Sequence, residues 1–560
     1  MYKLLNLFKS ITLSTNQLVF FTCVYLIFIL NIPFLAKTST EILALEEYNV
    51  FFLLSVPFFI LSLAITIQCF FAFRWITKPL LILLVLLSSV VFYSTVTYGI
   101  VFDYGMIQNT IETDSSEAFS YLSFSAFLFF AVFGVLPSIL IANVKLTYSF
   151  FWGELFSRLK LLSVSFGTFV LILIAFYSSY ASIGRNNRDL VGYLTPYALI
   201  DSTVKYVQKN YLYPPLKFTV LDTAPKIVKN KLSKQVTVLV LGETARSINF
   251  SLNGYNKPTN QFTQKFGVVS FKNVTSCGTA TAVSVPCMFS RLNKSSYDKR
   301  IAIAQQNAID MIHLAGADVL WVSNNTGSCK GVCARVKTKK IPTDKINPLC
   351  DGDVCLDEVL IGELSQKLIS LTHENTLIIL HMIGSHGPTY YKRYPSSQRI
   401  FTPDCQRSDI QNCTHEELVN TYDNTIAYTD YVLSRIITEL VVISESQDVK
   451  TSMIYVSDHG ESLGESGVYL HGLPYAFAPE EQTHVPLIFW ADPFHQNNRL
   501  NCLNSISDQP ISHDNLFDIL MGEMHVKTTA YIEENNPFTA CHLDSSIAQT
   551  KTQTIDLGAK

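Results

Sequence analysis

The sequence lacks a charge excess of either sign, because 42 Lys and Arg residues against 45 Asp and Glu residues leave a net charge of −3. Such a balance does not offer the basic surface that nucleic acid requires, so we expect no nucleic-acid partner. Histidine is absent before His313, and no internal repeat or low-complexity tract is present. At 560 residues the chain is too long for one compact core, so we expect two or more folding units.

Long apolar runs are concentrated before about residue 180. Five of these runs have a length close to that of a transmembrane helix, which needs about 20 residues. No small-residue cleavage site follows the first run, which argues for a retained span instead of a signal peptide. The expected transmembrane domain at 1–180 has spans at 17–35, 49–73, 79–101, 121–143 and 160–180.

The charged residues in the connections predict the orientation of these spans. Basic residues flank the start of the first span and occupy every second connection, whereas the other connections are acidic. By the positive-inside rule the N-terminus is cytoplasmic, and an odd number of spans places everything after residue 180 outside. The basic residues are Lys3, Lys9, Arg74, Lys78, Lys145, Arg158 and Lys160, and the acidic ones are Glu41, Glu46, Glu47, Asp103, Glu112, Asp114 and Glu117.

Cysteine usage independently predicts an exported domain. Ten of the 12 cysteines follow residue 180, and an even number in an oxidising compartment indicates disulfides. A structural zinc site is the alternative, but the repeated CxxC spacing of such sites is missing. Cys23 and Cys69 lie within predicted spans. The expected pairs are Cys277–Cys287, Cys329–Cys333, Cys350–Cys355, Cys405–Cys413 and Cys502–Cys541.

The second half alternates short apolar runs with helical patterns. Continuously apolar strands between helices predict an α/β domain whose mostly parallel sheet is covered on both faces. We expect this domain at 235–545, after a bridging segment at 181–234 and before a polar tail at 546–560. The expected strands are 235–241, 317–322, 376–382, 453–457 and 485–490.

Acidic and imidazole groups stand beside several of these strands. Glu243 follows the first, Asp458 and His459 follow the fourth, and His484 precedes the last. Open α/β sheets place their chemistry at the carboxyl edge, so these groups could converge there. Carboxylate oxygen and neutral imidazole suit zinc. The alternatives are structural: an Asx turn at Asp458 and a helix cap at Glu243.

A run of small residues between Cys277 and Cys287 holds the candidate nucleophile. If this run opens a helix, its backbone N–H groups favour phosphate. A threonine hydroxyl beside a metal would lose its proton readily and attack phosphorus. Both Thr279 and Thr281 satisfy this description, and a plain Ser/Thr helix cap is the alternative. Together with Glu243, such a threonine predicts a phosphoryl-transfer site.

Combined, these motifs resemble those of the lipid A phosphoethanolamine transferases, a family that includes the mobile colistin-resistance enzymes. The resemblance covers nearly the whole chain and implies five spans followed by an alkaline-phosphatase/sulfatase-like domain. It also implies a multi-pass protein of the bacterial inner membrane with a periplasmic catalytic domain. The motifs are Gly242-Glu243-Thr244-Ala245-Arg246, Cys277-Gly278-Thr279-Ala280-Thr281, Ser385-His386-Gly387-Pro388 and Asp458-His459-Gly460-Glu461 with His471.

The resemblance assigns roles to individual residues. It selects Thr281 as the nucleophile and implies one tightly bound zinc ion, with a second ion left open. His386 and His471 would contact the substrate phosphate or that second zinc. The implied zinc ligands are Glu243, Thr281, Asp458 and His459, and the implied donor headgroup site is formed by Asn109, Thr113 and Lys330.

The implied reaction moves phosphoethanolamine from phosphatidylethanolamine to a phosphate of lipid A through a phosphothreonine, with polymyxin resistance as its consequence. We expect a monomer. Three alternatives remain open: the same transfer onto a lipopolysaccharide core sugar or a glycerol-phosphate polymer, a membrane-tethered phosphodiesterase or sulfatase that uses water, and a lipid-binding or sensor protein with a decayed hydrolase domain.

Overall fold

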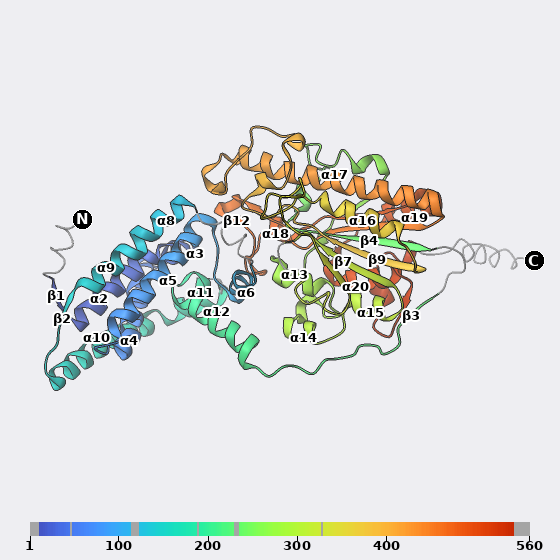
Figure 1. Ribbon diagram of the computed structural model, residues 1–560. Coiled ribbons are helices and arrows are strands. Elements are labelled where there is room, and N and C mark those ends of the chain that lie inside the picture. Colours follow the sequence, from blue (N-terminus) through green and yellow to red (C-terminus); the bar gives the residue numbers. More distant parts are fainter. Residues whose placement is uncertain are drawn as a thin grey trace, which may run out of the picture. The chain divides into compact units, whose positions relative to one another are not determined.

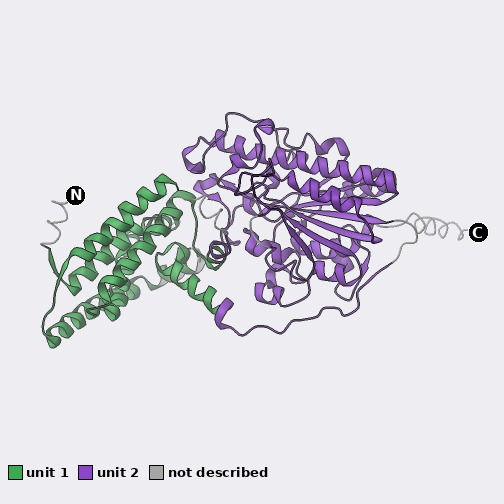
Figure 2. Cartoon of the chain, viewed as in Figure 1, with its two compact units in different colours: residues 1–107, 122–208 green, residues 108–121, 209–560 purple. Residues whose placement is uncertain are grey.

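The computed structural model describes residues 11–44, 48–113, 123–187, 190–228, 234–325 and 329–541. Within it the chain forms two compact units (Figure 2). Unit 1 comprises Met1–Ile107 and Leu122–Gln208, and unit 2 comprises Gln108–Tyr121 and Lys209–Lys560. The expectations for Lys3, Lys9, Glu46, Glu47, Asp114, Glu117 and the tail at 546–560 lie outside the described residues.

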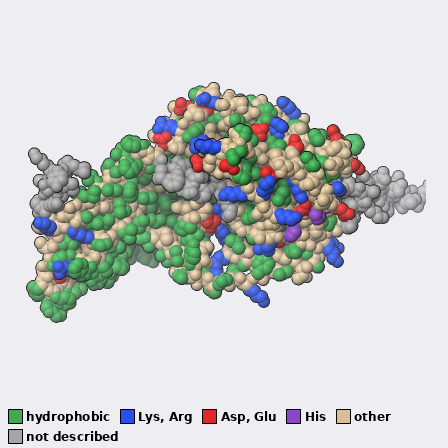
Figure 3. Space-filling model, in the orientation of Figure 1, with side chains coloured by type: hydrophobic (Ala, Val, Ile, Leu, Met, Phe, Trp, Pro, Cys, Tyr) green, Lys and Arg blue, Asp and Glu red, His purple; other side chains and the backbone are tan. Residues whose placement is uncertain are grey.

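Unit 1 is helical (Figure 1). Large apolar side chains such as Phe124, Phe151 and Leu171 are exposed on its helices, and Figure 3 shows hydrophobic side chains over much of its visible surface. Helices that are apolar all round are typical of membrane spans. The elements are β1 (Thr12–Ser14), α2 (Thr15–Tyr25), a π-helix (Leu26–Leu30), α3 (Ile32–Leu43), α4 (Val50–Phe71), α5 (Thr77–Tyr98), α8 (Phe124–Phe130), a π-helix (Ala131–Val135), α9 (Leu136–Asn143), β2 (Lys145–Thr147), α10 (Phe151–Asn186), α11 (Leu190–Tyr193) and α12 (Tyr197–Val207).

Among the described residues, four helices are long and apolar enough to cross a membrane, or five if one bent pair is counted as a span. The bend of 60° separates Thr15–Leu30 from Ile32–Leu43, within the predicted run 17–35. Pro33 lies in the first turn of α3 and has no N–H to continue the helix, while the Asn31 side chain donates to Leu26 O (2.9 Å). The four unbroken helices are Val50–Phe71, Thr77–Tyr98, Phe124–Asn143 and Phe151–Tyr177.

Unit 2 is built on a seven-stranded sheet, and the α/β prediction is confirmed. The strand order is β5-β13-β10-β4-β9-β7-β8. The five strands β10, β4, β9, β7 and β8 are parallel to one another. Only β13 is reversed, because it pairs antiparallel with both β10 and β5. Their bounds are β4 Gln235–Gly242, β5 Val269–Phe271, β7 Asp318–Ser323, β8 Lys337–Lys340, β9 Asn375–His381, β10 Lys450–Ser457 and β13 Leu487–Ala491.

Helices cover both faces of this sheet. Figure 1 shows α16 and α17 on one side and α13, α15 and α20 on the other. Alternate strand residues such as Leu239, Ile379 and Ile454 pack with the second group of helices in one buried core. The helices are α13 Thr281–Met288, α14 Lys299–Ile303, α15 Ala308–Leu314, α16 Val359–Ile369, α17 His415–Gln447, α18 Glu480–Thr483, α19 Pro493–Ser505 and α20 Leu516–Glu523, while α6 (Tyr104–Glu112) crosses the unit boundary.

Short strand pairs lie around the main sheet. They join β3 to β15, β6 to β14 and β11 to β12. The third pair precedes His471 directly and so helps to place that residue. The bounds are β3 Lys226–Ile227, β6 Val274–Thr275, β11 Ser462–Leu463, β12 Tyr469–Leu470, β14 Ile511–Ser512 and β15 Val526–Lys527.

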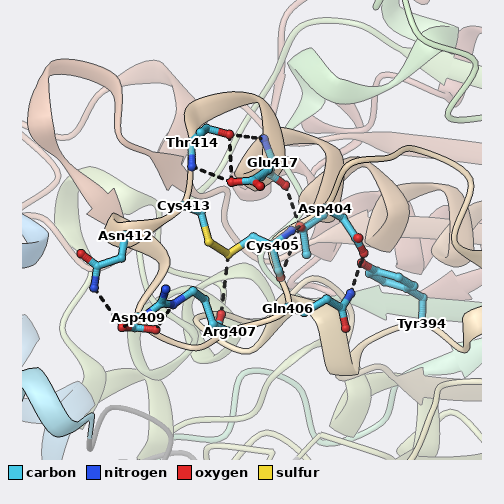
Figure 4. The surroundings of a disulfide bond; sticks show 11 residues. Tyr394, Asp404, Cys405, Gln406, Arg407, Asp409, Asn412, Cys413, Thr414 and Glu417 are labelled. Carbon is cyan, nitrogen blue, oxygen red and sulfur yellow. Dashed lines mark hydrogen bonds and ion pairs between the residues drawn. A yellow bond between two sulfur atoms is a disulfide. The ribbon is translucent and has the colours of Figure 1, made fainter.

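Five disulfides with the expected pairing are present in unit 2. Figure 4 shows the bond between Cys405 and Cys413 beside the start of α17. Thr414 and Glu417 form a reciprocal capping box at that helix terminus. Because the disulfide closes the segment just before the cap, it anchors the loop that leads into α17.

Candidate metal centre and nucleophile

The sheet register brings the candidate metal ligands together. Gly242 at the end of β4 is paired with Ser457 at the end of β10. The residues that follow, Glu243, Asp458 and His459, are therefore neighbours at the carboxyl edge of the sheet. All three are buried, and one ligand atom from each lies within 4.8 Å of the others.

The hydroxyl of Thr281 points at this cluster from the first residue of α13. Its Oγ1 lies 3.1 and 3.0 Å from the two carboxylate oxygens of Glu243 and 3.3 Å from Nε2 of His459. Thr279 is directed elsewhere, because its hydroxyl donates to Leu473 O (2.6 Å). The residue at the helix cap is Ala280, which makes no side-chain capping hydrogen bond. The geometry therefore brings Thr281, and not Thr279, to the carboxylates.

The buried carboxylates of the cluster favour a bound cation. Burial, followed by the charge of Glu243, raises the pKa of Asp458 to about 6. Burial opposes a charged imidazole, yet Asp458 and Glu243 outweigh it and raise the pKa of His459 to about 10. Burial also opposes ionisation of Glu243, but the hydrogen bond and charge of His459 hold its pKa well below the usual value. Two buried carboxylates at this spacing need a positive partner.

The donor set fits a zinc ion. One carboxylate oxygen, Oδ2 of Asp458, is buried and accepts no hydrogen bond from the described residues. Nε2 of His459 lies 3.3 Å from a Glu243 oxygen and 3.6 Å from this Oδ2. The other ring nitrogen, Nδ1, lies 2.9 Å from Gly460 O, which leaves Nε2 facing the carboxylates. Carboxylate oxygens and one imidazole nitrogen are ordinary zinc ligands.

Two further histidines lie next to the cluster. The ring centroids of His459 and His471 are 4.5 Å apart, and those of His471 and His386 are 5.5 Å apart. Nδ1 of His471 lies 3.3 Å from a carboxylate oxygen of Glu461, which is buried. The carboxylate thus orients the ring and leaves Nε2 for a ligand. By contrast, His484 lies outside this group, because its ring contacts Lys272 O (2.6 Å).

The predicted headgroup residues lie on and beside α6. The Thr113 hydroxyl donates to Asn109 O (2.7 Å) at the end of this helix. The Lys330 ammonium donates to Glu112 O (3.3 Å) and lies 3.7 Å from the Glu112 carboxylate, which also pairs with Lys299. Lysine ammonium groups at this helix end provide positive charge for a phosphate ligand.

Several site residues carried no sequence signal of their own. Asn325 donates to Oε2 of Glu243 (2.9 Å), and Gln108 donates to Ala282 O (2.9 Å) beside the candidate nucleophile. His513 lies 3.0 Å from Ser457 O through Nε2 and accepts from Cys277 N (3.1 Å) through Nδ1. Only Asn325, which follows β7 at the carboxyl edge of the sheet, could have been found by the strand-end argument.

Comparisons with known proteins show which family the chain is similar to. A sequence model of the sulfatase family matches residues 235–526, and one described as phosphoethanolamine transferase EptA/EptB matches residues 59–211. The chain is 39% identical to phosphoethanolamine transferase EptA of Escherichia coli K12, over 96% of this chain and 98% of that protein. It is 36% identical to phosphatidylethanolamine transferase Mcr-1 of Escherichia coli, over 92% of this chain and 97% of that protein.

A solved structure is similar over the same length. It is the integral membrane protein lipooligosaccharide phosphoethanolamine transferase A (EptA) from Neisseria meningitidis, with a TM-score of 0.88 and 34% sequence identity. The match covers 95% of this chain and 99% of that structure. Both the helical unit and the α/β unit are therefore shared with it.

Proposed function

The chain belongs to the phosphoethanolamine transferase family, and we propose that it moves phosphoethanolamine from phosphatidylethanolamine to a phosphate of lipid A through a covalent phospho-Thr281. The observation that carries this proposal is the Thr281 hydroxyl, 3.0 Å from a buried carboxylate oxygen of Glu243 and 3.3 Å from His459. An activated nucleophile needs a hydroxyl in contact with groups that can bind a metal ion or accept a proton, and Thr281 has such contacts.

Glu243, Asp458, His459 and Thr281 would hold one zinc ion. When bound, the ion acts as a Lewis acid that lowers the pKa of the threonine hydroxyl and offsets charge on the phosphoryl oxygens. His386 and His471 would contact the substrate phosphate or a second zinc ion.

In the first half-reaction Thr281 Oγ1, having lost its proton to solvent, attacks the phosphorus of phosphatidylethanolamine as the alkoxide. The new Oγ1–P bond forms as the bond from phosphorus to the diacylglycerol oxygen breaks, and that oxygen takes a proton from His471, which Glu461 orients. Lys330 and His386 offset the charge on the non-bridging oxygens, which is where phosphoryl transfer gains most of its stabilisation.

In the second half-reaction an oxygen of a lipid A phosphate attacks the phosphorus of phospho-Thr281. The P–Oγ1 bond breaks and leaves Thr281 as the alkoxide, while the neutral His471 imidazole takes the proton of the attacking phosphate hydroxyl and is restored for the next cycle. The ammonium of the transferred group masks part of the anionic charge of lipid A, which weakens the attraction of cationic peptides such as polymyxins.

The reaction requires a membrane location. We propose a multi-pass protein of the bacterial inner membrane, with the bent pair α2–α3 counted as the first of five spans, a cytoplasmic N-terminus and unit 2 in the periplasm. Five disulfides support an oxidising compartment for unit 2. One polypeptide supplies every proposed site residue, which supports a monomer.

Mass spectrometry of lipid A tests the function. Cells that express the chain should gain a phosphoethanolamine group on lipid A, and Thr281→Ala should abolish this gain while Thr279→Ala retains it. If phosphoethanolamine were found only on the core sugar of lipopolysaccharide, that sugar would be the acceptor instead of lipid A. Peptide mapping of the purified protein after incubation with phosphatidylethanolamine should place the adduct on Thr281. An adduct on another residue, or full turnover to free phosphoethanolamine without an acceptor, would overturn the proposal.

A further inference from the structure

Thr244, directly after Glu243, has a backbone conformation that threonine rarely adopts. Its φ is +58°, in the left-handed region. A β-branched residue is a genuine outlier there, because Cβ crowds the neighbouring carbonyl oxygen. Thr244 is also completely buried. Strain of this kind persists only where the surrounding structure holds it, and it is concentrated at functional sites.

Three hydrogen bonds hold Thr244 in place, and two of them go to candidate metal ligands. The Thr244 hydroxyl donates to Oε1 of Glu243 (2.6 Å), and its backbone N–H donates to Oδ1 of Asp458 (3.2 Å). Its carbonyl oxygen accepts from the Tyr422 hydroxyl (2.8 Å), which projects from α17. One strained residue therefore contacts carboxylates that follow two different strands.

The two oxygens of Glu243 each receive a separate neutral donor. Thr244 donates to Oε1, and Asn325 donates to Oε2 (2.9 Å). The other close neighbours of Oε1 are Thr281 and His459, which belong to the reacting group itself. Among the described residues outside that group, only Asn325 would then hold this carboxylate, and it holds Oε2 and leaves Oε1 without a fixed donor.

We propose that Thr244 is a positioning residue that orients the carboxylates of Glu243 and Asp458 for the metal. This inference rests on the proposed metal centre and adds to it the residue that aims two of its ligands. The left-handed backbone is retained because it presents the hydroxyl to one carboxylate and the N–H to the other. Hydrogen bonds from outside a metal centre fix ligand orientation, and their loss typically weakens metal binding by about 10–100-fold.

The test separates the hydroxyl from the branched shape. Thr244→Val keeps the shape and removes the donor, whereas Thr244→Ser keeps the donor. The zinc affinity of the full chain in detergent is measured by competition with a chromophoric chelator. We expect zinc binding about 10–100-fold weaker for Thr244→Val and close to wild type for Thr244→Ser. Thr237→Val is the matched control. Thr237 is a buried threonine of β4 whose hydroxyl forms a hydrogen bond with the Ser452 hydroxyl (3.1 Å), so its replacement should leave zinc affinity unchanged.

A glycine variant keeps the test decisive if the valine variant does not fold. Thr244→Gly removes the hydroxyl, and glycine adopts a positive φ without steric strain. We expect it to fold, as judged by circular dichroism in chelator, and to show the same loss of zinc affinity. Wild-type zinc affinity in Thr244→Gly or Thr244→Val would overturn the role of Thr244 and leave the metal centre untouched. Equal losses of affinity in Thr244→Ser and Thr244→Val would do the same. A wild-type chain that binds no zinc would overturn the metal centre itself.

Discussion

Replacing Gly384 by alanine probes how closely the backbone packs behind Glu243. Gly384 follows β9 with a φ of +52°, and its N–H donates to the buried carboxylate of Asp357 (2.8 Å). A Cβ built on it would lie 2.6 Å from Glu243 O, 3.0 Å from Glu243 N and 3.1 Å from Glu243 Cβ. Two of the three neighbours are backbone atoms, so the contact cannot be relieved by a change of rotamer.

The size of the expected displacement follows from these distances. Ordinary van der Waals contact begins near 3.4 Å, so the Glu243 carbonyl must move by roughly 0.8 Å relative to residue 384. Zinc–ligand distances tolerate only about 0.2 Å. We therefore expect Gly384→Ala to weaken zinc binding by about 10–100-fold, the usual effect of disturbing the residues around a metal centre. The left-handed conformation of the new alanine should add about 1–2 kcal/mol of destabilisation.

Two measurements check this prediction: zinc affinity by chelator competition and the melting temperature in chelator. Gly362→Ala is the control, because a Cβ there meets no atom within 4 Å and the residue lies inside helix α16. Alanine is favoured over glycine in a helix by about 0.5–1 kcal/mol, so the control should melt at a higher temperature with unchanged zinc affinity. Wild-type zinc affinity in Gly384→Ala would refute the reasoning.

Three further predictions concern the stability of unit 2. Replacing both Cys502 and Cys541 by serine removes the disulfide that closes a loop with a sequence separation of 39. The unfolding free energy measured by denaturant titration should fall by about 4 kcal/mol. An unchanged denaturation midpoint would contradict this prediction. Burial lowers the pKa of His513 from 6.5 to about 3. The neutral imidazole therefore contributes about 5 kcal/mol of stability, which is complete above pH 6.5 and is lost as the pH falls towards 3. The melting temperature of His513→Gln should therefore depend less on pH in that window, and parallel pH profiles would be the contrary result. Asp357 is a buried acceptor of two backbone N–H groups, so Asp357→Asn should lower the unfolding free energy by about 1–3 kcal/mol. The exposed Asp353→Asn is the control and should change it by less than about 0.5 kcal/mol. Equal effects of the two substitutions would argue against the assigned hydrogen bonds.

The sequence predicted five of the seven strands of the sheet, because those five are largely buried. It missed β5, which has three residues, and β8, which is exposed along its length. Strands buried on both faces are apolar throughout, so the run at 235–241 identifies β4 (Gln235–Gly242) within one residue. The antiparallel direction of β13 was not predicted, because direction depends on which edge of the sheet a connection reaches. The bend at Asn31 was also missed, because an apolar run shows hydropathy and does not show the angle between two helical segments.

By itself, the sequence determined that this protein has an apolar helical part and an α/β part, and that Glu243, Asp458 and His459 stand at strand ends. Strand ends are local features, and the carboxyl edge of a parallel sheet collects them whatever the strand order. Only the tertiary structure decided which threonine hydroxyl reaches the carboxylates and which residues hold them. Asn325 reaches Glu243, and the Thr244 N–H reaches Asp458, because β7, β9, β4 and β10 are adjacent in the order 7-9-4-10, and that order arises from the packing of the whole domain.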